Sequence, residues 1–243
     1  MSDLIVQTDG PIKRLTLNRP EKRNALSLPL AEALLEHIQE SETDGTRLLV
    51  LKGNGSSFCA GFDFGNFTES SPGDLLLHFV RIEQMLQALA YASFDTAAFV
   101  HGNVVGAGAD VAVACGHKIA EANSKFMFPG ARFGLILGTR RLARSIGGQQ
   151  ASRLVGGPSI DAEEALRIGL IDSIGPESDQ TAYENQLLET LLETSLSTRK
   201  KVLNACRVDS RSDDMRDLVN SASSSDIKNQ LDTYFKKLAS KKK

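Results

Sequence analysis

The chain has 243 residues, with 28 basic and 30 acidic side chains and a formal net charge of −2. Such a balance provides no general positive field for a polyanion, so we expect no nucleic-acid partner. Cys59, Cys115 and Cys206 form no C-x-x-C pair, which argues against a disulfide framework or a zinc site. The length predicts one compact core with at most an appended helical segment.

The beginning of the chain, Met1 to Asp9, has neither a basic region nor a long apolar stretch. No later run approaches the roughly 18 uninterrupted apolar residues that a membrane span needs. We therefore expect no signal peptide, no membrane partner and a reducing, cytoplasmic compartment.

The first part of the chain alternates strand and helix patterns. Residues 4–6 and 12–17 read as a hairpin of short strands. A helix capped by Ser27 follows, and its apolar positions recur at helical spacing: Leu30, Ala33, Leu34 and Ile38. The apolar run 48–51 is typical of a parallel strand that is covered on both faces.

The same alternation continues further along. We expect an amphipathic helix over 74–92, a buried strand over 96–100, a small-residue helix over 109–114 and short strands at 118–120 and 125–128. Asp161 is a predicted helix cap, with Glu164 as its reciprocal partner.

After Pro176 the apolar periodicity predicts helices only. The fold class is therefore α/β. We assign residues 1–190 to the core and residues 191–243 to a C-terminal helical region.

Two glycine-bearing turns, 57–64 and 101–110, each follow a predicted buried strand. Small residues there let a ligand approach the backbone and meet free N–H groups. Two such donors aimed at one thioester oxygen would stabilise an enolate by several kcal/mol. Taken alone, each turn is more typical of ordinary tight packing than of a ligand site.

Four segments in order carry a family resemblance: Leu15 to Leu26, Phe58 to Asp63, Gly102 to Gly108 and Ser159 to Ile171. They resemble the crotonase (enoyl-CoA hydratase/isomerase) family. The resemblance implies a crotonase-like (ClpP/crotonase) spiral of ββα units whose C-terminal helices pack into a homotrimer or a dimer of trimers. It also implies an acyl-CoA thioester as substrate, with coenzyme A as part of that substrate and no separate cofactor or metal.

By position, the resemblance makes the backbone N–H groups of Phe62 and Ala107 the oxyanion hole. The residues implied to contact the acyl-CoA are Ala25, Ala60, Phe62, Asp63, Phe64, Gly65 and Ala107. Lys237 matches a closing-helix lysine that meets a CoA phosphate.

The sequence departs from the family at both catalytic glutamates. Asp110 stands at the first position and Gly130 at the second. Aspartate keeps a carboxylate but retracts it, whereas glycine transfers no proton. The alternative for Asp110 is a helix-start carboxylate that complements the helix dipole. The turn after Phe133 is also about three residues shorter than the family pattern, which reshapes one wall of the acyl pocket.

Other polar residues receive mainly structural interpretations. We interpret Asp63 as a loop-fixing acceptor, His101 as a structural histidine and Cys59 as a small packing residue. His78 and Glu83 either form a polar helix face or turn toward the acyl group.

These features predict an enzyme that forms an oxyanion-stabilised enolate, an isomerase or hydratase-like lyase with Asp110 as its proton-transfer group. Ordinary hydration with two glutamates is not expected. One alternative is decarboxylation or carbon–carbon cleavage, because loss of CO₂ generates the enolate without both glutamates. The other is a non-catalytic acyl-CoA-binding subunit.

Overall fold

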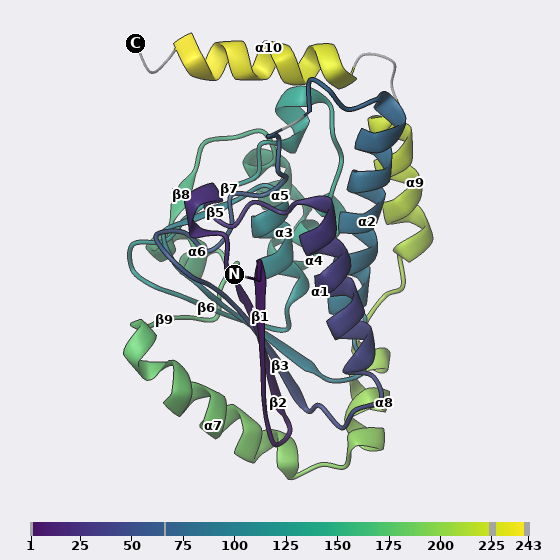
Figure 1. The fold of residues 1–243 in the computed structure, drawn as a ribbon. Helices are drawn as coiled ribbons and strands as arrows, with labels where there is room; N and C mark the ends of the chain where they lie inside the picture. The colour runs from purple at the N-terminus through teal and green to yellow at the C-terminus, as the bar shows by residue number, and fades with distance from the viewer. Residues whose placement is uncertain (1, 66, 224–226, 241–243) are drawn as a thin grey trace.

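The computed structural model describes residues 2–65, 67–223 and 227–240. In this part of the chain the larger sheet has the strand order β1-β2-β3-β4-β6-β9 (Figure 1). Its strands are β1 (Leu4–Asp9), β2 (Ile12–Leu17), β3 (Leu48–Gly53), β4 (Asp95–Val100), β6 (His117–Ala120) and β9 (Ser173–Ile174). β1 and β2 form the predicted antiparallel hairpin, and every later pair in this sheet is parallel.

A smaller sheet has the order β5-β7-β8, with strands β5 (Asn103–Val105), β7 (Lys125–Met127) and β8 (Ile160–Asp161). The first glycine-bearing turn runs beside it, because Cys59 forms an isolated parallel bridge with Val104 of β5. The smaller sheet therefore brings the two predicted turns together.

Helices cover both faces of the larger sheet. On one face lie α1 (Leu28–Glu40), α2 (Pro72–Ala90) and α3 (Ala107–Ala114), and Leu49 and Leu51 of β3 point into that core. On the other face lies α7 (Gln180–Leu192), which packs on Leu48 and Val50 (Figure 1). The apolar run predicted to be a doubly covered strand is confirmed.

The remaining helical elements complete the path. They are η1 (Pro20–Lys22), η2 (Gly130–Phe133), α4 (Thr139–Ile146), α5 (Gly148–Leu154), α6 (Ala162–Arg167), η3 (Glu177–Asp179), α8 (Leu196–Cys206), α9 (Arg211–Ala222) and α10 (Ile227–Ser240). α4 and α5 were not predicted, because their short sequences show no extended apolar period.

Most predicted helix starts are close to the observed ones. The Ser27 hydroxyl accepts from the Leu30 N–H, as expected of a cap, although Ala31 is fully buried where Ala33 was predicted. Asp161 caps α6 by accepting from the Glu164 N–H, but the predicted reciprocal hydrogen bond to the Glu164 side chain was wrong. Both carboxylate oxygens of Glu164 instead accept from Arg167, at 2.5 and 2.6 Å.

α3 begins at Ala107, two residues earlier than expected. This start places the Ala107 N–H at the first helical position, where an α-helix provides no internal acceptor. It also places Asp110 in the first helical turn.

The C-terminal helices share the main core. Leu218 of α9 and Ile227 and Leu231 of α10 belong to the same buried cluster as α1 and α2. α8 is tied to β4 by Arg199, whose guanidinium donates to both oxygens of Asp95 at 2.6 and 2.7 Å. Among the described helices, none combines the length and apolar character that a bilayer span requires. The division at residue 190 and the trimer stay predictions.

The side chain of Asn24 joins three backbone segments through hydrogen bonds. Its side-chain amide donates to the Asn54 and Ser57 carbonyls at 2.8 and 2.9 Å, and its oxygen accepts from the Arg19 N–H at 2.8 Å. Asn24 is fully buried at φ +54°, a backbone region that asparagine tolerates better than alanine.

We expect Asn24→Ala to lower the free energy of unfolding by about 3 kcal/mol, because all three hydrogen bonds of a fully buried side chain are lost. Urea denaturation measures this loss, with Asn185→Ala on the exposed side of α7 as the control. Equal stability of the two variants would contradict the bracing role of Asn24.

Candidate active site

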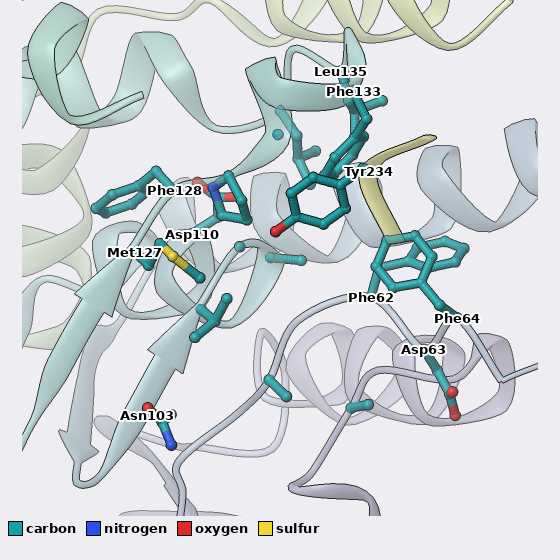
Figure 2. A pocket seen from close by; sticks show the side chains of 18 of the residues that line it. Phe62, Asp63, Phe64, Asn103, Asp110, Met127, Phe128, Phe133, Leu135 and Tyr234 are labelled. Carbon is teal, nitrogen blue, oxygen red and sulfur yellow. The ribbon is translucent and has the colours of Figure 1, made fainter. Parts of the chain in front are cut away.

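A pocket of about 870 Å³ lies where the two predicted turns meet. Its lining comes from the first turn, the β5–α3 junction, η2, the segment before α4, and α10 (Figure 2). Most of its wall is apolar: Phe62, Phe64, Phe79, Met127, Phe128, Phe133, Leu135, Leu137, Leu142, Val155 and Phe235. Such a pocket fits an apolar chain better than a highly charged ligand.

The two turns approach so closely that glycine is required at their contacts. A Cβ added to Gly61 would lie 2.5 Å from the Val105 carbonyl oxygen and 3.2 Å from the Ala107 nitrogen. A Cβ on Gly108 would lie 2.5 Å from the Cys59 carbonyl oxygen. Gly61 also has φ +85°, which disfavours any other residue. The glycines therefore serve close packing, and that packing brings Phe62 beside Ala107.

The amide of Phe62 points away from its neighbouring strand segment. Phe62 pairs with Leu26 in a parallel bridge, in which Leu26 donates to the Gly61 carbonyl at 2.7 Å and accepts from the Asp63 N–H at 3.1 Å. In that pattern the N–H of Phe62 faces the opposite side. Neither the Phe62 nor the Ala107 amide donates to any residue within the described ranges, and both residues line the pocket.

Side chains behind the first turn fix this amide in place. His78 of α2 donates from Nε2 to the Leu26 carbonyl at 3.0 Å, and its ring lies 4.1 Å from that of Phe62. Burial lowers the pKa of His78, so the ring is neutral at neutral pH. His78 is thus neither a group facing the acyl pocket nor part of a solvated face.

Asp63 has the loop-fixing role that we predicted. One oxygen accepts from the Gly65 N–H at 3.0 Å, and the other accepts from the Arg19 guanidinium at 2.8 Å. Burial opposes ionisation, but these hydrogen bonds and the Arg19 charge hold the pKa of Asp63 below its ordinary value. The same guanidinium donates to the Ala25 carbonyl at 2.6 Å, which links the opening segment to the turn.

Asp110 is the one carboxylate deep in the described pocket wall. It is 5% exposed, and no described residue hydrogen-bonds its carboxyl group. A Cβ on Gly138 would lie 2.1 Å from its Oδ1, so Asp110 packs directly against the start of α4. Burial raises the pKa of Asp110 well above the ordinary value; the positive charge of Arg141 opposes this rise and the negative charge of Glu83 adds to it.

Glu83 lies behind Asp110 in a buried ionic cluster. Arg141 of α4 forms a two-point ion pair with Glu83 of α2 and also donates to Asp214 of α9 at 3.2 Å. Gln87 donates to Glu83 at 2.8 Å. Glu83 is 1% exposed and does not line the pocket. Both predicted alternatives, a polar helix face and a position toward the acyl group, were therefore wrong for Glu83.

The structure brings together nearly all of the predicted contact residues. Those that line the pocket are Ala25, Ala60, Phe62, Asp63, Phe64, Gly65, Ala107 and Asp110. Lys237 lies on α10 outside this lining, and its phosphate contact stays a prediction. Sequence reasoning missed Phe133 and the adjacent Tyr234 and Phe235, whose only signal was an aromatic pair in a lysine-rich helix.

Two further interpretations agree with the contacts. His101 bonds the Gly55 carbonyl at 2.9 Å, as a structural histidine does. Cys59 is fully buried and its thiol donates to the Asn24 carbonyl at 3.0 Å. Because burial raises the pKa of Cys59 to about 12, its thiol is not a nucleophile.

The fold and this pocket define a protein of the crotonase type. The family model for enoyl-CoA hydratase/isomerase matches residues 7–239. The chain belongs to the enoyl-CoA hydratase/isomerase family.

Named relatives within this family are enzymes of differing reactions. An enoyl-CoA isomerase/hydratase of Mycosarcoma maydis is 34% identical over 69% of this chain and 66% of that protein. The 2,3-dehydroadipyl-CoA hydratase of Escherichia coli is 34% identical over 77% of this chain and 74% of that enzyme. The ethylmalonyl-CoA decarboxylase of Bos taurus is 33% identical over 78% of this chain but only 63% of that enzyme.

A solved structure confirms the predicted fold class. An enoyl-CoA hydratase/isomerase homologue from Bordetella parapertussis superposes with a TM-score of 0.94 at 36% identity, over 96% of this chain and 98% of that one.

The buried carboxyl of Asp110 predicts a pH-dependent stability. Because its pKa is raised in the folded state, the folded protein holds a proton that the unfolded chain releases above about pH 4. Stability is therefore lost as pH rises from that value toward the folded pKa. Asparagine has no such proton to lose.

We therefore expect Asp110→Asn to be more stable than the native protein at neutral pH and to lose that advantage near about pH 4. Chemical denaturation across this pH range measures the difference. A variant less stable than the native protein at neutral pH would contradict an uncompensated carboxyl at this position.

Proposed function

We propose that the protein isomerises the double bond of an enoyl-CoA thioester through an enolate, with Asp110 as the single proton-transfer group. The observation that carries this proposal is that two amides and one buried carboxyl, none with a hydrogen-bond partner among the described residues, belong to the lining of a single pocket. The amides of Phe62 and Ala107 act as the oxyanion hole. The thioester oxygen lies between them, and the acyl chain extends along the apolar wall.

The reaction needs only one carboxyl because the same proton is removed and returned. Ionised Asp110 takes a proton from the alpha carbon of a 3-enoyl thioester, and the electron pair of that bond moves onto the thioester oxygen. The enolate then collapses, a double bond forms between the alpha and beta carbons, and the gamma carbon takes the proton back from Asp110. A raised pKa suits this shuttle, because a group that titrates nearer neutral pH both accepts and donates.

Hydration makes a second demand that the pocket does not meet. A water molecule must be activated while the alpha carbon is protonated, which in this family is the work of two glutamates. The second position is Gly130, which lines the pocket without a side chain. A Cβ there would lie 3.0 Å from the Leu135 carbonyl oxygen, so the backbone is already crowded.

The test is a substrate panel of 3-enoyl-CoA, 2-enoyl-CoA and malonyl-type CoA thioesters. We expect interconversion of the two enoyl isomers, little hydration, and a loss of roughly 10²- to 10⁴-fold in kcat for Asp110→Asn, with acyl-CoA binding retained. Asp213→Asn on the exposed side of α9 is the matched control. Binding without turnover of any thioester would instead identify a non-catalytic acyl-CoA-binding subunit.

Decarboxylation is the second candidate, and the raised pKa of Asp110 favours it. Loss of CO₂ from a malonyl-type thioester leaves its electron pair as the enolate, so no base is needed. A neutral carboxyl then protonates the alpha carbon. The similarity to an ethylmalonyl-CoA decarboxylase supports this candidate as well.

The pH profile of kcat separates the two candidates. An isomerase needs ionised Asp110 first, so its kcat rises as pH increases through the raised pKa. A decarboxylase needs protonated Asp110, so its kcat falls over the same range. A profile that is flat and unchanged in Asp110→Asn would remove this residue from either mechanism.

A further inference from the structure

α10 forms one wall of the pocket and is fixed there by several contacts. The ring of Phe235 lies 4.9 Å from that of Phe64 and 5.2 Å from that of Phe67. Lys228 donates to the carbonyls of Thr68 and Ser70 at 3.0 and 2.7 Å. The helix therefore rests on the segment that follows the first turn, and its side chains have defined positions in the wall.

Tyr234 is the residue through which α10 presents a polar atom to the pocket. Its ring lies 5.2 Å from that of Phe133 in η2. Figure 2 shows the ring entering the cavity with its hydroxyl directed toward the side that holds Asp110 and Met127. No residue within the described ranges forms a hydrogen bond with this hydroxyl, and the rings of Phe133 and Phe235 lie beside that of Tyr234.

This arrangement brings Tyr234 onto the same 3-10 helix, η2, that carries Gly130. Gly130, at the position of the missing glutamate, belongs to the same η2 turn as Phe133, on which Tyr234 packs. The polar groups of the pocket lining thus include two from distant elements, Asp110 of α3 and Tyr234 of α10. A half-buried phenol among aromatic rings finds a partner only in a ligand or in water.

A hydrocarbon chain filling this chamber would remove water from the Tyr234 hydroxyl and return no hydrogen bond. An acyl chain that carries an oxygen would accept that bond. Since one chain satisfies the buried hydroxyl and the other leaves it unsatisfied, the preference between two such chains is about tenfold, which corresponds to about 1.4 kcal/mol.

We propose that Tyr234 contacts the acyl group and selects acyl-CoA thioesters whose chain carries a hydrogen-bond acceptor, such as a keto oxygen, beyond the reactive carbons. This inference rests on the proposed function only in that the acyl group of a CoA thioester occupies this pocket. It does not depend on which reaction follows.

The test measures binding of saturated thioesters, which undergo neither isomerisation nor decarboxylation. The probes are hexanoyl-CoA and its analogues with a keto group at the gamma or delta carbon, titrated by calorimetry. We expect the native protein to bind one keto analogue about tenfold more tightly than hexanoyl-CoA, and Tyr234→Phe to abolish that ratio while retaining hexanoyl-CoA. Tyr183→Phe, a half-buried tyrosine of α7 outside the pocket, is the matched control.

The outcomes separate this inference from the proposed function. A native preference that Tyr234→Phe leaves unchanged, or equal binding of all probes by the native protein, overturns the role of Tyr234 alone. Failure of the native protein to bind any of these thioesters overturns both. Loss of the preference in Tyr234→Phe, together with an inactive substrate panel, would support the contact and reject the reaction.

Discussion

The close contact between two turns is the constraint on which the site depends. Gly61 lies against the Val105 carbonyl and the Ala107 nitrogen, and Gly108 lies against Cys59. A side chain at either glycine would separate the turns, and Phe62 and Ala107, whose amides have no partner in the described ranges, would no longer line one pocket. The lost packing would cost stability, but the larger consequence would be chemical, because a hole with one donor stabilises an enolate much less than a hole with two.

A buried carboxyl in the same pocket as these amides is unfavourable for folding, and in the proposed reaction it is favourable for proton transfer. Asp110 has no hydrogen-bond partner in the described chain, and the nearby cation, Arg141, is already paired with Glu83 and Asp214. The ionic cluster therefore holds α2, α4 and α9 together without neutralising Asp110. A carboxyl whose pKa is raised by burial is a stronger base once ionised, so the cost in stability and the proposed activity have the same origin.

The C-terminal helices complete a pocket that the core alone leaves open. α10 contributes Tyr234 and Phe235 to the wall, and its buried residues belong to the main hydrophobic cluster. The pocket is thus made from parts of the chain more than a hundred residues apart, with Phe62 and Ala107 from the core and Tyr234 and Phe235 from α10.

Local sequence patterns predicted the features that depend on neighbouring residues. The apolar run 48–51 predicted a buried strand, and the glycines of both turns predicted two backbone segments that a ligand can approach. The early start of α3 was not predicted, because glycine has a low helix propensity and Gly106 and Gly108 flank the first helical residue, Ala107.

Other parts of the site depend on long-range contacts that no local pattern encodes. Glu83 and Arg141 are 58 positions apart, and only tertiary packing makes them a buried pair. Tyr234 likewise enters the pocket because α10 folds back over η2. The family resemblance led to Phe62 and Ala107, which both line the pocket, but it gave no information on the wall that α10 contributes.

A crystal structure with a bound saturated acyl-CoA tests the central claim most directly. The account predicts that the thioester oxygen lies about 3 Å from both the Phe62 and the Ala107 nitrogens, with the acyl chain beside Asp110. A thioester oxygen that reaches only one of these amides, or an acyl chain outside this pocket, would contradict it.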